Sequence, residues 1–387
     1  MKLNRLWETY PDYQKLLNAL VNENNRKIYL KGLQGSSISF LIASMVLRKE
    51  TGSCLLFLSR DNQEMIHFFQ DVISFTGLQE NKNIFIFPSF EVLPYEDIAR
   101  DNHIVEQRLK VLSMLAANQD NDLQDKKKKK AYPMVIVTNY KAILPRIMNY
   151  QDFSEQYCQL KKQGILQKET FLNYLVCQGY QYSGMVEYPG QFSQRGGMID
   201  LFPFTEENPI RIELDSDHIE SLRFFQVESQ RSIEKVDEIL LLPQRELFDS
   251  TNGKKMKTSS FFDYLPSKTT VMIQESLELE KTIKAFEQET FQLYQEKKQN
   301  NVDKLTLPEE GYLTWEQVVR LVDQHCPVLY FDGIVDQENF RDDQDIKSIA
   351  EYNIETNSIQ SYYGKLDLFF EDIKKWQYEK KNLLLVA

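Results

Sequence analysis

The sequence predicts an α/β protein that combines a parallel sheet with a smaller α+β unit. Three observations support this class. Short aliphatic runs alternate with helical stretches from Lys27 to about Pro145. From about Leu160 to Leu242 the segments are short, alternate in polarity and are separated by Gly and Pro, and after Pro243 the first pattern returns. Strands covered on both faces are continuously apolar, whereas half-exposed strands alternate.

Continuous apolar runs predict four strands in the first region, with helices between them. The expected strands are Lys27–Leu30, Ser53–Ser59, Asn83–Pro88 and Met134–Thr138. The expected helices are Ser39–Lys49, Asn62–Thr76 and His103–Ala117. The stretch Asn118–Lys130 ends in five lysines and has no apolar periodicity. We interpret it as a solvated loop in preference to a nucleic-acid patch, because like charges repel.

The second region is expected to contain a helix followed by an antiparallel sheet. The helix is Lys168–Gly179, and the strands are Met185–Tyr188, Gly197–Phe202, Ile210–Leu214 and Ile219–Phe225. The third region predicts strands Val271–Gln274 and Val328–Phe331 with helices Leu277–Lys298 and Thr314–His325. Beyond these we expect a linker at Gln337–Asp345, a helix at Lys365–Lys375 and an apolar strand in Lys381–Ala387. We expect that last strand to belong to a domain that continues further.

Composition narrows the class of protein. The chain has 387 residues, enough for two or three domains, and a formal net charge of −11. This acidity argues against a chain that coats DNA or an anionic membrane, although one local basic face remains possible. Without an apolar run of ~18 residues or a secretory signal, we expect a cytoplasmic protein that contacts no membrane. The four Cys and four His are scattered, which predicts neither a metal site nor disulfides.

A Gly-containing turn follows the first expected strand, where nucleotide-binding proteins carry the phosphate loop G-x-x-x-x-G-K-[ST]. Here Gly32 is the first Gly, Ser37 replaces the second, Ile38 replaces the Lys, and Ser39 keeps the hydroxyl, with Gly35 inside the loop. Ile38 cannot neutralise phosphate. The loop alone leaves two readings open: a relic of an ATPase without activity, or a helix start capped by Ser. We find no other catalytic set, so we expect no enzyme and no cofactor in this chain.

Several ordered segments carry a more specific resemblance. Phe87–Glu96, FPSFEVLPYE, is similar to a "W-E-x-L-P-Y-D" segment, with Phe90 at the Trp position. His103–Leu115 has the pattern "I-x-x-R-L-x-x-L", and Val135–Leu144 follows. The strongest match runs from Gly179 to Pro243 and includes GQFSQRGGMIDLFP. On these segments the chain resembles the N-terminal part of bacterial transcription-repair coupling factors, whose first domains are similar to the excision-repair protein UvrB.

The resemblance implies a domain order. Residues 1–156 and 243–336 are expected to form two segments of one UvrB-like, superfamily 2 helicase-like domain with a degenerate P-loop. Residues 157–242 are expected to be an inserted α+β domain that binds UvrA. Residues 346–387 are expected to start a further α/β domain.

The function that the resemblance implies is recruitment. This region would bind UvrA and so bring nucleotide-excision repair to RNA polymerase stalled at a DNA lesion. Absent downstream domains would bind polymerase, translocate on double-stranded DNA with ATP and Mg²⁺, and include a C-terminal autoinhibitory domain that packs on this region. The alternative is a UvrB-like, ATP-binding excision-repair helicase.

The resemblance also names contact residues. The UvrA-contacting arginines of the family fall on Arg195 and Arg211, and a third contact, an aromatic residue, falls on Asp215. Because Arg195 precedes one expected strand and Arg211 opens the next, we expect the two arginines to meet side by side across a sheet. The alternative is that both only bridge local acids such as Glu213.

Overall fold

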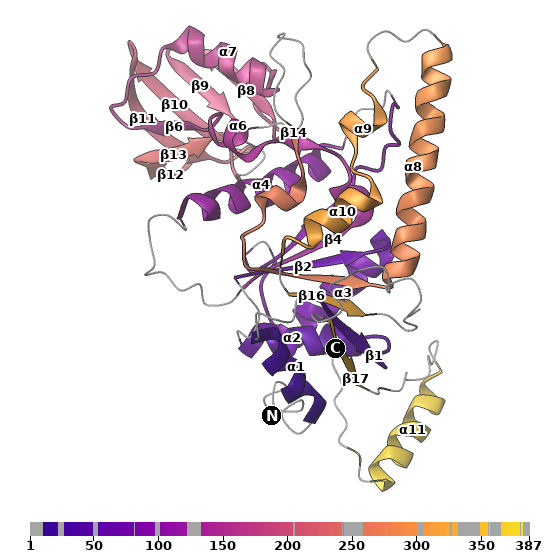
Figure 1. The fold of residues 1–387 in the computed structure, drawn as a ribbon. Coiled ribbons are helices and arrows are strands. Elements are labelled where there is room, and N and C mark those ends of the chain that lie inside the picture. The colour runs from indigo at the N-terminus through magenta and orange to yellow at the C-terminus, as the bar shows by residue number, and fades with distance from the viewer. Residues whose placement is uncertain are drawn as a thin grey trace.

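The structure is a computed structural model, in which a large parallel sheet and a smaller, mainly antiparallel sheet organise the chain (Figure 1). It describes residues 11–21, 27–48, 53–80, 82–96, 101–121, 133–203, 206–241, 243, 258–300, 305–325, 327–331, 349–354, 356, 365–379 and 381.

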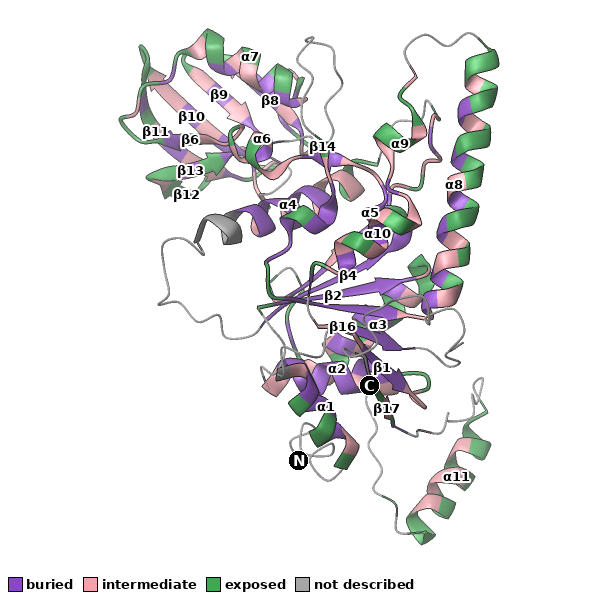
Figure 2. Ribbon diagram, in the orientation of Figure 1, coloured by how far each residue is buried: buried purple, intermediate pink, exposed green. Residues whose placement is uncertain are grey.

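The large sheet has seven strands among the described residues, in the order β17-β1-β16-β15-β2-β4-β3, and every neighbouring pair is parallel. Its strands are β1 (Lys27–Lys31), β2 (Cys54–Ser59), β3 (Ile84–Phe87), β4 (Met134–Asn139), β15 (Thr269–Gln274), β16 (Val328–Phe331) and β17 (Ile349–Asn353). Six of them confirm expected strands. All of β2 and β4 is buried, which explains why these segments are continuously apolar (Figure 2).

Helices cover both faces of the large sheet. One core cluster joins it to α1 (Pro11–Val21), α2 (Ser37–Arg48) and α3 (Asn62–Thr76). A second cluster joins the other face to α4 (Asn102–Asn121), α8 (Ser276–Gln299) and α10 (Trp315–Val322). The predicted helices are confirmed with small changes at their ends. For α10, the Thr314 hydroxyl and the Gln317 side chain form a capping box, which fixes its first turn.

The last part of the chain differs from the expected organisation. Strand β17 pairs in parallel with β1, from Lys27 opposite Ile349 to Lys31 opposite Asn353. The prediction that residues 346–387 start a separate domain is therefore wrong for β17, because backbone pairing makes it an edge strand of the large sheet. The expected linker 337–345 and the strand residues 382–387 lie outside the described residues. Helix α11 (Leu366–Tyr378) confirms the expected helix and lies away from the sheet (Figure 1).

The small sheet has the order β12-β11-β10-β9-β8-β7, antiparallel except for the β7–β8 pair. Its strands are β7 (Gln181–Tyr182), β8 (Gln191–Arg195), β9 (Met198–Leu201), β10 (Ile210–Asp215), β11 (His218–Phe225) and β12 (Ser232–Val236). Helix α7 (Lys168–Gln178) ends at Gly179 in the left-handed region, and β6 (Cys158–Lys161) pairs with β13 (Glu238–Leu241). The strand expected at Met185–Tyr188 is wrong, since these residues form a loop.

Short elements connect the two sheets. They are α5 (Tyr140–Ile143), β5 (Ile147–Met148), α6 (Tyr150–Ser154), β14 (Thr258–Ser259), the 3₁₀ turn η3 (Phe261–Tyr264) and α9 (Pro308–Gly311). Strand β5 pairs with β14, so the chain entering the small sheet and the chain leaving it run side by side.

One face of the small sheet is apolar and packs against α7. Its core contains Phe171 and Leu175 from the helix and Phe192, Ile199, Leu201, Ile210, Ile212 and Leu222 from the strands. Because side chains alternate along a strand, the intervening residues form the opposite face. We call this the outer face and define it by Ser193, Arg195, Asp200, Arg211, Glu213 and Arg223.

Candidate partner-binding face and degenerate nucleotide loop

Arg211 is held inside the outer face. Its Nε and Nη2 atoms donate to the Asp200 carboxylate at 2.7 and 2.8 Å, and both side chains are 14% exposed. The guanidinium also lies over the Phe225 ring, 4.4 Å from its centroid, and Nη2 donates to the Gln230 side chain at 3.1 Å. The hydrogen bonds to Asp200 raise the pKa of Arg211. The contacts of Arg211 therefore mainly stabilise its own sheet.

A second ion pair lies beside the first on the outer face. Arg223 is directly opposite Arg211 on the neighbouring strand and pairs with Glu213. The Ser221 hydroxyl donates to the same Glu213 carboxylate at 2.6 Å. Two arginines and two carboxylates thus balance one another across β9, β10 and β11.

Arg195 differs from these arginines because it is exposed. It ends β8, just before the turn at Gly196 and Gly197, and its Nη2 atom donates to the Gly184 carbonyl at 2.6 Å. It forms no ion pair with any residue that the structure describes. Its guanidinium therefore keeps donors that a carboxylate of a partner could accept from.

The expectation that Arg195 and Arg211 meet side by side is wrong. Strand β9 lies between β8 and β10, and Arg195 is level with Met198 and Glu213, two residues further along than Arg211. Arg211 does bridge a local acid, as the alternative predicted, but the acid is Asp200 and not Glu213. Asp215 is exposed at the far end of β10, opposite His218.

The degenerate loop follows β1 as the sequence predicts, and part of its backbone conformation requires glycine. Gly32 has φ +82°, and a Cβ there would lie 2.7 Å from Asn353 Oδ1 and 2.8 Å from the Ile354 carbonyl oxygen. Gly35 has φ +54° but open space around it. Ser37 begins α2, and Ser39 is buried. Ile38 is 7% exposed and packs in the core cluster of α2 and α3.

A residue that is distant in sequence, Thr356 beyond the neighbouring strand β17, forms hydrogen bonds with this loop. The Gln34 N–H donates to the Thr356 hydroxyl at 2.9 Å and to the Ser37 hydroxyl at 2.8 Å. Thr356 in turn donates its hydroxyl and its N–H to the Gly32 carbonyl at 3.0 and 2.9 Å. Phosphate loops bind anions through backbone N–H groups, and here such a group is used by the chain itself. Nothing in the sequence pattern pointed to Thr356.

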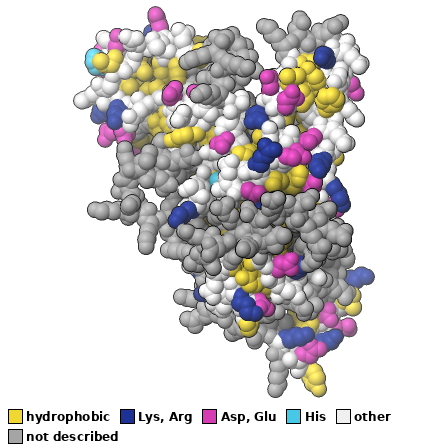
Figure 3. All heavy atoms as spheres, in the orientation of Figure 1, with side chains coloured by type: hydrophobic (Ala, Val, Ile, Leu, Met, Phe, Trp, Pro, Cys, Tyr) yellow, Lys and Arg dark blue, Asp and Glu magenta, His cyan; other side chains and the backbone are white. Residues whose placement is uncertain are grey.

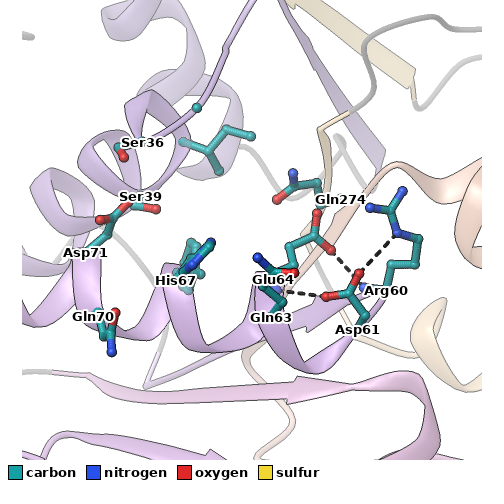
Figure 4. Close-up of a pocket in the computed structure, with 13 residues that line it drawn as sticks. Ser36, Ser39, Arg60, Asp61, Gln63, Glu64, His67, Gln70, Asp71 and Gln274 are labelled. Atoms are coloured by element: carbon teal, nitrogen blue, oxygen red, sulfur yellow. Dashed lines mark hydrogen bonds and ion pairs between the residues drawn. The ribbon is translucent and has the colours of Figure 1, made fainter. Parts of the chain in front are cut away.

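A cavity of about 410 Å³ lies beside the loop, at the carboxyl ends of β1, β2 and β15 (Figure 4). Ser36 and Ser39 line one side, and Arg60 and Gln274 line the other (Figure 4). Its ionisable side chains include the carboxylates of Asp61, Glu64 and Asp71.

Acidic side chains outnumber basic ones around this cavity. Arg60, the one arginine among the described lining residues, forms ion pairs with Glu275 at 2.7 Å and with Asp61 at 3.6 Å. Asp61 caps α3 by accepting from the Glu64 N–H at 2.8 Å, and burial raises the pKa of Glu64. Among the described lining residues, three carboxylates thus stand beside Arg60 and His67, and Arg60 is already paired with acids.

Among the described residues, no group of three His, Cys, Asp or Glu side chains could hold a metal ion. Among the same residues, no helix has both the length and the apolar character that crossing a bilayer requires.

One region of the chain matches a known domain family. Residues 158–247 match the UvrB interaction domain family, and they include α7 and every strand of the small sheet. The outer face lies within the region that matches this family.

Several curated proteins that are similar to this chain are transcription-repair-coupling factors. The protein of Bacillus subtilis strain 168 is 29% identical over 238 residues, which cover 61% of this chain and 18% of that protein. Those of Escherichia coli K12 and Myxococcus xanthus are 26% and 27% identical, over 55% and 57% of this chain and 17% and 18% of their own lengths. The resemblance inferred from the sequence is confirmed, and the matched region spans less than a fifth of each relative.

Proposed function

We propose that this chain is the recruitment region of a transcription-repair coupling factor. It binds UvrA through the outer face of its UvrB interaction domain and so brings nucleotide-excision repair to RNA polymerase stalled at a DNA lesion. The observation that carries the proposal is this domain at 158–247 with Arg195 exposed on its outer face. In this proposal other domains bind RNA polymerase, double-stranded DNA, ATP and Mg²⁺. The autoinhibitory domain is also separate from this chain.

The chemistry of the outer face supports a carboxylate-bearing partner. Arginine presents a planar fork that matches a carboxylate and is enriched among residues that dominate binding energy. Arg211 and Arg223 are paired internally, so Arg195 is the outer-face arginine whose donors can reach a partner. In this proposal Arg211 acts by holding Asp200 and the strands in place.

The proposal also assigns no ATPase activity to this chain. Three observations support that assignment: Ile38 stands where a lysine would meet phosphate, Thr356 occupies the Gln34 N–H, and carboxylates line the adjoining cavity. Losing the lysine alone removes several kcal/mol of charge stabilisation in a site built around it.

The experiment is a titration of the purified chain with UvrA by isothermal calorimetry. Arg195→Ala should weaken binding at least tenfold, about 1.4 kcal/mol. The matched control is Lys162→Ala, which removes an exposed cation from a turn elsewhere in the domain and should leave affinity within twofold. Absence of UvrA binding by the wild-type chain would refute the function. Equal affinity of Arg195→Ala and wild type would refute the assigned residue.

A further inference from the structure

The loop at residues 183–190, between β7 and β8, exposes two large apolar side chains. Met185 is 45% exposed and Tyr188 is 66% exposed, while Val186 between them is 1% exposed. The buried Val186 anchors the loop, and its neighbours point out. In Figure 3, hydrophobic side chains gather on the visible face of the small domain. Two exposed apolar side chains on one fixed loop offer a surface that a partner could bury favourably.

Hydrogen bonds fix the loop in one conformation. The Gln191 side-chain oxygen accepts from the Glu187 and Tyr188 N–H groups at 2.9 and 3.1 Å. The Ser183 hydroxyl donates to the Met185 carbonyl at 2.7 Å, and the Gly190 N–H donates to the Phe202 carbonyl at 2.7 Å. A loop already held in this way loses little conformational entropy when it meets a partner.

The loop is continuous with the outer face through Gly184. The Gly184 carbonyl accepts from Arg195 Nη2 at 2.6 Å and from the Ser193 hydroxyl at 3.3 Å. The same arginine that offers donors to a partner therefore also touches the backbone next to Met185. An apolar patch bordered by an arginine has the composition of an interface centre.

We propose that loop 183–190 supplies the apolar part of the UvrA contact. Met185 and Tyr188 pack on an apolar patch of UvrA, and Arg195 pairs with a carboxylate at the border of that patch. This inference rests on the proposed function, and it adds residues to which that proposal gives no role. Asp215, exposed and charged at the C-terminal end of β10, contributes no apolar surface.

The test replaces the exposed apolar pair and compares it with another such pair. Met185→Ser with Tyr188→Ser should weaken UvrA binding more than tenfold. The control, Ile165→Ser with Val176→Ser, removes side chains that are 73% and 58% exposed elsewhere in the domain, and it should keep affinity within twofold. Thermal unfolding of both variants checks that the domain still folds.

A second measurement needs no variant. Peroxide oxidation of Met185, followed by mass spectrometry, should slow severalfold when UvrA is bound, because the interface covers the thioether.

The outcomes separate the two proposals. If the wild-type chain does not bind UvrA, the proposed function fails. If it binds and Arg195→Ala weakens the complex, but the Met185 and Tyr188 variant binds like wild type and Met185 oxidation is unchanged, only this inference is overturned.

Discussion

The Asp200 carboxylate accepts two parallel hydrogen bonds from Arg211, and the pair is mostly withdrawn from solvent. Replacing Arg211 with Ala would leave a mostly buried carboxylate without its cation. We expect the free energy of unfolding to fall by about 2–3 kcal/mol. In contrast, Arg195→Ala should change it by less than about 0.5 kcal/mol, because that side chain is exposed. Urea titration measures both.

A double-mutant cycle checks the origin of that loss. Asp200→Ala combined with Arg211→Ala removes both charges, so the double variant should be more stable than the sum of the two single losses predicts. Simple additivity would mean that the ion pair contributes nothing, and that the loss comes from the packing of Arg211 on Phe225.

Two glycines of the degenerate loop should respond differently to Ala. At Gly32 the added methyl group meets Asn353 and the Ile354 backbone within 3 Å, in addition to the cost of a positive φ. At Gly35 the methyl group meets nothing, so only the backbone cost of about 1 kcal/mol remains. We expect Gly32→Ala to be the more destabilising by at least about 1 kcal/mol in chemical denaturation. Equal losses would contradict the close packing of β17 against the loop.

Restoring a lysine should not restore nucleotide binding. In Ile38→Lys the Thr356 hydroxyl still occupies the Gln34 N–H, and Asp61, Glu64 and Asp71 still line the cavity. We expect neither this variant nor the wild-type chain to saturate with a fluorescent ATP analogue at micromolar concentrations. Saturable binding by the wild-type chain would favour the alternative of a UvrB-like ATP-binding helicase. Because Ile38 is in the core, circular dichroism must first establish that the variant folds.

Acid should destabilise the protein partly through His325. Burial lowers the pKa of this imidazole in the folded state, whereas the unfolded chain titrates near 6.5. The unfolded state therefore binds the proton first, so the unfolding free energy declines as the pH falls below about 6.5, until the folded-state pKa is reached. His325→Gln should flatten this part of the pH dependence, measured by urea titration from pH 7.5 to 5. An unchanged slope would exclude His325 as the source.

The strands of the large sheet could be predicted because burial on both faces makes their sequences continuously apolar. Segments such as Cys54–Ser59 are apolar throughout, and each predicted strand of this kind is present. The small sheet gave a weaker signal. Strands β8 (QFSQR) and β12 (SIEKV) were not predicted, because their half-exposed residues are mostly polar. The prediction of a strand at Met185–Tyr188 is wrong because an exposed loop can show the same alternation of apolar and polar residues as a half-buried strand.

The candidate sites depended on contacts between distant residues. The sequence pattern pointed to Ile38, and the family resemblance pointed to Arg195 and Arg211. Neither indicated that Asp200 pairs with Arg211 or that Thr356 bonds to the loop. Pairing of this kind depends on which strands are neighbours and on which residues lie opposite one another, and the apolar pattern of a single segment does not identify its partner segment. The expectation for Arg195 and Arg211 is wrong because Arg195 belongs to β8, a strand that the sequence did not predict, and β9 lies between β8 and β10.

The position of β1 in the large sheet has a consequence for how the protein is made. Both neighbours of β1, β16 and β17, come after residue 327, beyond the entire small sheet. Ribosomes add about 5–20 residues per second, so β1 waits tens of seconds in the nascent chain before either partner exists. Throughout that interval both of its hydrogen-bonding edges are open to other chains. We infer that the nascent chain depends on chaperones, or on early packing of α1 and α2, to protect β1 until its neighbours emerge.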